Sequence, residues 1–250
     1  MTAQEGSWAN LFRISALFLP LAGFLVLCGQ AIQVYLDTLP LPPANAASSG
    51  YVPFSPSFLQ SFDFVGFHAS LFNSEYSLLT LGVLAFLPAV IALFVALRST
   101  DVGISTVALA LSSVGVVLVL LAAVDAFTEI QEAVTWDGGC TSCGNTPISL
   151  AFGTSAGGVA LQLGELLIIV GILVLSVLML RNAAFGKVSG VLGIVAALYA
   201  LVGVFLFSSL SELDSDIGAA SAFLLFVLWE LSVAPRMLRL GRSNPNPGEV

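Results

Sequence analysis

The stretch VALQLGELLIIVGILVLSVLMLR, residues 159–181, decides the fold of this chain. Its side chains are apolar or small, except for Gln162 and Glu165, until Arg181 ends the run. A helix rises about 1.5 Å per residue, so about 20 such residues cross the hydrocarbon core of a bilayer. The stretch therefore predicts a transmembrane helix with a carboxyl group inside it.

The composition of the whole chain agrees with a membrane protein. The 250 residues are 58% hydrophobic and 9% charged, and the mean hydropathy is +1.02. Soluble domains carry about 25% charged residues, so the chain is too apolar for a water-soluble fold. The net charge of −8 argues against a nucleic-acid partner, because no basic patch is available to neutralise phosphates. The lipid bilayer is the partner that this composition predicts.

Further apolar runs predict an all-α bundle of six transmembrane helices in a single domain, residues 1–250. Large loops at 36–75 and 128–158 are expected to cap one side, and residues 236–250 to form a tail after Pro235 ends the last span. The basic residue before the first run is also typical of a signal peptide, but the run is long and more spans follow, so we expect an uncleaved helix. The predicted spans are 11–35, 76–97, 102–127, 159–181, 188–208 and 218–235.

The basic residues predict how the bundle is oriented. All seven fall on one side of the six-span topology, and the opposite loops, 36–75, 128–158 and 209–217, contain none. The positive-inside rule then predicts a multi-pass protein of a prokaryotic cell membrane with both termini in the cytoplasm. These residues are Arg13, Arg98, Arg181, Lys187, Arg236, Arg239 and Arg242.

Glu165 is the least expected residue of the spans. A charge at mid-bilayer costs about 2.5–3.5 kcal/mol, and no basic residue lies on its predicted side of the membrane. We expect Glu165 to be protonated, or to face a polar cavity with Gln162, Gln30 and Asp125 on the outer halves of their helices. Two interpretations stay open: a proton- or cation-binding site open to the outside, or a neutral acid that hydrogen-bonds within the bundle.

We expect a different role for Glu230. It is predicted to lie in the cytoplasmic third of the last span, where Arg98 and Arg181 are within reach. An ion pair that fixes helix ends is preferred to a functional site. Trp229 beside it suits an aromatic anchor at the membrane interface.

Cys140 and Cys143 have the spacing of a redox or metal-binding pair. A disulfide persists on the outer side of a cell membrane, and a loop-closing disulfide is the preferred interpretation. A metal site needs further ligands, and the single histidine, His68, lies in another loop, so we predict no metal. Thiol oxidases in membranes commonly use two cysteine pairs, whereas the third cysteine here, Cys28, lies inside the first span.

Small residues predict where helices meet. Gly157, Gly164 and Gly171 recur every seven residues, and Gly186 and Gly190 open the fifth span. In lipid, small side chains let backbones approach closely. We expect these glycines to join helices within one bundle, with a contact between two copies as the alternative.

The second half of the chain resembles a broad prokaryotic family of six-helix membrane proteins whose function is unknown. The resemblance covers about residues 76–250 and follows a span ending in Arg181, a short turn with Lys187 and Gly190, and a last span with Trp229 and Glu230. In that family the turn usually contains a proline, where this chain has Phe185 or Gly186. The resemblance implies six helices and no catalytic residues.

No nucleotide-binding, metalloprotease or serine-hydrolase motif is present in the sequence, and we predict no cofactor. The scarcity of polar residues in the spans favours a non-enzymatic accessory subunit or membrane interaction protein, whose partners would be other membrane subunits. One alternative is a small ion-coupled transporter that uses Glu165 and Asp125. Another is an outer-face thiol–disulfide oxidoreductase at Cys140 and Cys143.

Overall fold

The computed structural model describes residues 3–40, 64–135, 146–206 and 212–242. Within these ranges the regular structure is helical, and six helices are long and apolar enough to cross a membrane, which confirms the predicted fold class. The helices are α1 (Ala3–Asp37), α3 (Ala69–Leu97), α4 (Val102–Thr135), α5 (Thr146–Arg181), α6 (Gly186–Leu206) and α7 (Glu212–Arg242).

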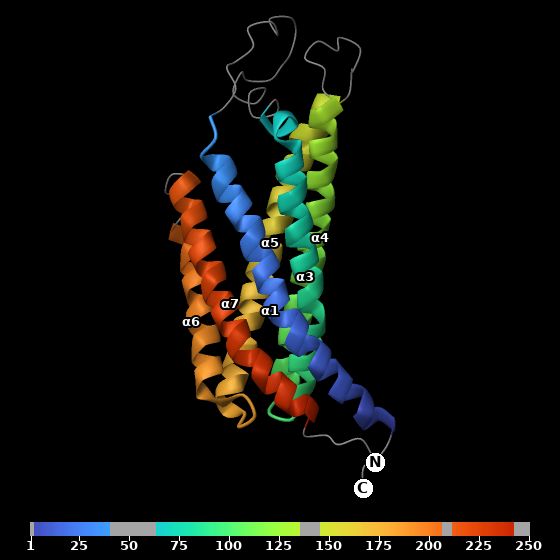
Figure 1. The fold of residues 1–250 in the computed structure, drawn as a ribbon, viewed down its shortest axis with the longest axis vertical. Coiled ribbons are helices and arrows are strands. Elements are labelled where there is room, and N and C mark those ends of the chain that lie inside the picture. The colour runs from blue at the N-terminus through green and yellow to red at the C-terminus, as the bar shows by residue number, and fades with distance from the viewer. Residues whose placement is uncertain (1–2, 41–63, 136–145, 207–211, 243–250) are drawn as a thin grey trace, which may run out of the picture.

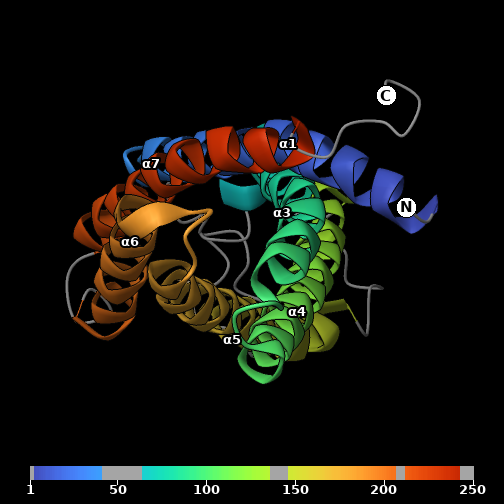
Figure 2. The same cartoon turned by 90° about the horizontal axis from the view of Figure 1, so that it is seen from below.

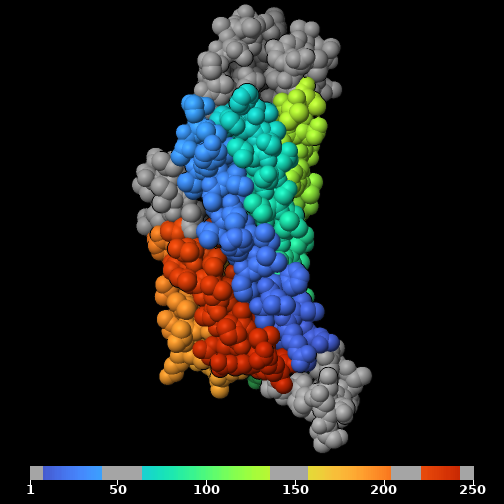
Figure 3. All heavy atoms as spheres, viewed as in Figure 1, coloured from blue at the N-terminus to red at the C-terminus, as the bar shows by residue number. Residues whose placement is uncertain are grey.

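The six helices form a ring that follows the order of the chain (Figure 2). Each helix packs mainly against its two neighbours, and α7 closes the ring against α1. Seen from the side, α1 crosses one face between α3 and α7 (Figures 1 and 3). Gly241, near the end of α7, lies against Ala9, near the start of α1. We call this end of the bundle the terminal end and the opposite end the distal end.

The helices are longer than the predicted spans. At the distal end α4 continues to Thr135 and α5 begins at Thr146, so helix occupies most of the predicted loop 128–158. The prediction that Pro235 ends the last helix is wrong, because α7 continues to Arg242. Val233 and Met237 on either side of the proline are fully buried, and this packing outweighs the hydrogen bond that the proline removes.

The glycine repeat of α5 joins this helix to α4. A Cβ on Gly164 would lie 2.8 Å from the backbone oxygen of Gly115, and a Cβ on Gly115 would lie 2.6 Å from the backbone oxygen of Gly164. Gly157 and Gly171 also face α4. The prediction that these glycines join helices within one bundle is therefore confirmed.

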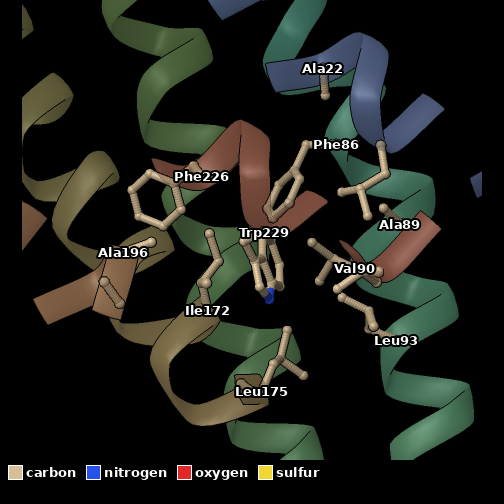
Figure 4. Packing of buried hydrophobic residues seen from close by; sticks show 14 of the residues in the cluster. Ala22, Phe86, Ala89, Val90, Leu93, Ile172, Leu175, Ala196, Phe226 and Trp229 are labelled. Carbon is tan, nitrogen blue, oxygen red and sulfur yellow. The ribbon is translucent and has the colours of Figure 1, made fainter. Parts of the chain in front are cut away.

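Trp229 of α7 fills the interior of the ring. Figure 4 shows its indole between Val90 and Leu93 of α3 and Ile172 and Leu175 of α5. The side chain is fully buried, so the expectation that Trp229 anchors the protein at the membrane interface is wrong. Its position lets α7 contact helices on the far side of the ring.

Gly186 begins α6 and has the left-handed backbone angle φ of +70°. A Cβ there would lie 2.5 Å from Nη1 of Arg236. We expect Gly186→Ala to lower the free energy of unfolding by about 1–2 kcal/mol, because a left-handed backbone brings Cβ too close to the carbonyl oxygen. Thermal unfolding of the purified protein in detergent measures this.

The matched control is Gly103→Ala, in the first turn of α4. Gly103 is exposed, and a Cβ there would have Asp101 Oδ1 as its nearest neighbour, at 3.5 Å. This variant is expected to be as stable as the wild type or slightly more stable. Equal melting temperatures for the two variants would contradict the account of Gly186.

Candidate functional site

Glu75 is a buried carboxyl group in the second turn of α3. It is 7% exposed, and within the described part of the chain its Oε2 has no hydrogen-bond partner. The last turns of α1 pack against this part of α3, since a Cβ on Gly29 would lie 3.3 Å from the backbone oxygen of Glu75. Asp37 of α1 interacts electrostatically with Glu75, and the Asp37 Oδ1 accepts a hydrogen bond of 3.2 Å from Gln33 Nε2. Two carboxyl groups from neighbouring helices thus lie close together.

Tyr76 connects Glu75 with the acids of α4 and α5. Its side chain interacts electrostatically with the carboxyl groups of Glu75, Glu129 and Glu165. The ring packs edge-on against Phe127 of α4, with the ring centroids 6.3 Å apart. The phenol therefore lies among acids from three helices.

The last turns of α4 present three acids at helical spacing. Asp125, Glu129 and Glu132 are four and three residues apart, so they share one face, and Glu129 interacts electrostatically with both others. Asp125 contacts Gly157 of α5, and its Oδ2 finds no hydrogen-bond partner in the described ranges. The group formed around these contacts is called the acid site below. Its members are Asp37, Glu75, Tyr76, Asp125, Glu129, Glu132 and Glu165.

The structure brings two of the four residues of the predicted polar site into the acid site. Glu165 and Asp125 are half-buried, and Tyr76 and Glu129 link them. Gln162 lies on the exposed face of α5. Gln30 is half-buried on α1, next to the glycine that contacts α3.

Sequence reasoning missed Glu75 and Tyr76, because the predicted span began at Tyr76 and Glu75 was assigned to a loop. In the structure α3 begins seven residues earlier, at Ala69. A signal was available: Phe72, Tyr76 and Leu79 already follow helical spacing, with no proline or glycine from Phe67 to Leu81. The same early start of the helix buries Glu75 against α1.

The predicted inner ion pair is not brought together. The carboxyl group of Glu230 lies against Gly23 of α1, whereas the guanidinium of Arg98 lies over the ring of Trp8, 5.6 Å from its centroid. Gly23 and Trp8 are 15 residues apart on one helix, which is about 22 Å. Arg181 is exposed at the end of α5. Glu230 is therefore separated from Arg98 by most of the length of a span.

The cysteine pair cannot be placed, because Cys140 and Cys143 lie outside the described residues; the predicted disulfide stays a prediction. Cys28 is a half-buried free thiol on α1. The ring of His68 packs against Phe64, with centroids 4.6 Å apart. Among the described residues, no three His, Cys, Asp or Glu side chains converge as a preformed metal site.

Comparison of the chain with protein-family models, with curated proteins and with solved structures finds no match. The resemblance to a six-helix family therefore stays a prediction. The structure shows a bundle of six helices long and apolar enough to cross a membrane, with acids that interact electrostatically with Tyr76 toward its distal end.

Proposed function

We propose that this protein is a small ion-coupled carrier that binds a cation at the acid site. The observation that carries the proposal is the burial of Glu75, whose Oε2 has no hydrogen-bond partner among the described residues and which interacts electrostatically with Asp37. Burying a carboxylate without an opposite charge is costly, and ionisable groups inside membrane spans are by default candidates for ion sites. A bound cation would balance the charge of these groups.

The distribution of charge supports the proposed direction of binding. The lysine and arginine residues lie toward the terminal end of the bundle. This end contains the first turns of α1, the last turns of α3, α5 and α7, and the turn between α5 and α6. Under the positive-inside rule this end faces the cytoplasm, and the acid site is then nearer the outside. A negative site near the outer surface attracts cations from that side.

The chemistry of the site suits a hard cation. Its groups are carboxylate and phenol oxygens, which favour ions such as Na⁺, Mg²⁺ or Ca²⁺ over soft metals. Protons compete for the same carboxylates, because protonation removes the negative charge that a cation needs. Cation binding is therefore expected to weaken as the pH falls.

The first test is cation-dependent stability of the purified protein. Chloride salts of Na⁺, K⁺, Mg²⁺ and Ca²⁺ are compared with choline chloride at constant ionic strength. We expect at least one cation to stabilise the wild type by about 1.4 kcal/mol at ten times its dissociation constant, because it binds only the folded state. This stabilisation should be lost in Glu75→Gln.

The matched control is Asp101→Asn, in the turn at the terminal end. Asp101 Oδ1 caps α4 by accepting a hydrogen bond of 2.9 Å from the backbone N–H of Ile104. Asparagine caps helices as well as aspartate does, so this variant loses one negative charge and keeps the cap. It should respond to the cation as the wild type does. If both variants lose the response, binding at the acid site is contradicted.

Transport itself is tested in proteoliposomes that hold a pH-sensitive dye. A gradient of the stabilising cation is expected to move protons through the wild type and not through Glu75→Gln. A wild type that binds the cation and moves no protons would contradict the carrier.

That outcome would favour a second candidate, a non-enzymatic accessory subunit. One observation supports this candidate: the interior around Trp229 is packed with apolar side chains from α3 and α5 (Figure 4). A bundle whose interior is filled with apolar side chains at this level has no polar path for an ion, as expected of a protein that does not transport. Its partners would be other membrane subunits.

A further inference from the structure

Glu230 lies near the middle of the bundle. Its carboxyl group contacts Gly23, where a Cβ would overlap Oε2. Gly23 is fifteen residues after Trp8 and fourteen before Asp37, the two ends of the apolar span of α1. The expectation that Glu230 lies in the cytoplasmic third of its helix is therefore wrong. The reason is that α7 continues well beyond Pro235, which shifts Glu230 toward the centre of the helix.

Among the described residues, no basic side chain approaches the carboxyl group of Glu230. Glu230 is 5% exposed, and none of the residues that the structure describes forms a hydrogen bond with its Oε2. No titratable side chain lies on the stretches of the neighbouring helices at this level. These stretches are residues 14–27 of α1, 77–97 of α3 and 188–198 of α6. On α7 itself the nearest basic residue is Arg236, whose guanidinium lies against Gly186.

An unpaired charge at this position would cost several kcal/mol, which favours the neutral acid. The neutral form also fits the contact with Gly23. The backbone of Gly23 gives the carboxyl group one hydrogen bond, whereas a buried carboxylate needs water or donors around both oxygens, and α1 packs directly against Oε2. The close approach of α1 to α7 is therefore compatible with a protonated Glu230.

We propose that Glu230 is a proton-binding site in the middle of the membrane, and that its protonated form holds α1 against α7. On release, the O–H bond of the acid breaks, the proton passes to a water molecule that enters between the helices, and a carboxylate remains. Hydration of that carboxylate requires α1 to move away from α7 at Gly23. The proposal stands on the contact with Gly23 and does not depend on cation binding at the acid site.

Hydrogen exchange of the α1 backbone tests this proposal. The full-length protein is reconstituted in lipid nanodiscs, and exchange of the amides of residues 17–29 is compared between the wild type and Glu230→Gln at each pH. The comparison at equal pH removes the intrinsic effect of hydroxide. We expect equal rates at pH 5 and rates about tenfold faster in the wild type at pH 10, because only the wild type can ionise and open.

A control variant, Asp101→Asn, removes an acid at the terminal end, keeps the cap of α4 and should exchange as the wild type does. The same pH dependence in Glu230→Gln as in the wild type would overturn the proposal. If Glu230→Gln does not fold, Gly23→Ala tests the proposal instead. The Cβ of alanine would push against the carboxyl group of Glu230. The faster exchange of α1 should then begin at a lower pH than in the wild type. A wild-type exchange profile in Gly23→Ala would equally overturn it.

Discussion

Gly164→Leu is expected to separate α4 from α5 and to lower the free energy of unfolding by at least about 3 kcal/mol. Even a Cβ at this position would lie 2.8 Å from the backbone oxygen of Gly115 and 3.0 Å from the backbone nitrogen of Val119. Backbone atoms cannot rotate away as a side chain can, so the two helices have to move apart. Among the described helices, α4 and α5 make the most extensive contact, and we expect much of the protein to aggregate during purification.

The measurement is the melting temperature and the fraction of monodisperse protein in detergent. The control is Gly158→Leu, six residues earlier on α5, where no described residue lies within 4 Å of a Cβ. This variant places a large apolar side chain on an open face and should keep the melting temperature of the wild type. A similar drop of the melting temperature in both variants would show that leucine on α5 is harmful in general. It would contradict a specific contact between α4 and α5 at Gly164.

Trp229→Ala is expected to destabilise the bundle by about 3–5 kcal/mol, because it deletes the largest fully buried side chain of the described residues and leaves a cavity. The indole also packs against Gly193 of α6, where a Cβ would lie 2.6 Å from its Nε1. The loss therefore affects α3, α5 and α6 together. In the proposed carrier the variant should also leak, since the indole fills the interior of the ring.

Leu228→Ala provides the comparison for Trp229→Ala. Leu228 precedes Trp229 on α7 and is 46% exposed, so its truncation removes an apolar side chain from the outer face of the bundle. We expect a loss below about 1 kcal/mol and no leak. Proton leak through proteoliposomes and thermal unfolding are measured on both variants. If Trp229→Ala is as stable as Leu228→Ala and leaks protons no faster, the indole does not close the interior.

Much of the architecture could be predicted from local patterns. The six apolar runs specify six helices, because each run is long enough to satisfy its own backbone within lipid. The spacing of Gly157, Gly164 and Gly171 also predicted a helix contact correctly, since a seven-residue repeat keeps small residues on one face. These features depend on neighbours in sequence and on the solvent that surrounds the helix.

The ends of the helices and the neighbours of the acids could not be predicted in the same way. The helix α3 begins before its apolar run, and this early start buries Glu75 against α1. Glu230 was expected beside arginines and lies against a glycine, because the partner on α1 depends on how the two helices align along their axes. Hydropathy contains no information on that alignment.

The sequence by itself determined that the chain is a helical membrane protein with six spans, because the length and composition of each run decide its transfer into lipid. Tertiary structure decided which acids meet. The ring brings Glu75, Tyr76, Glu129 and Glu165 together from three helices and places Glu230 against Gly23 of a fourth. Contacts of this kind depend on the rotation and register of packed helices. Rotation and register are set by contacts between residues far apart in the chain.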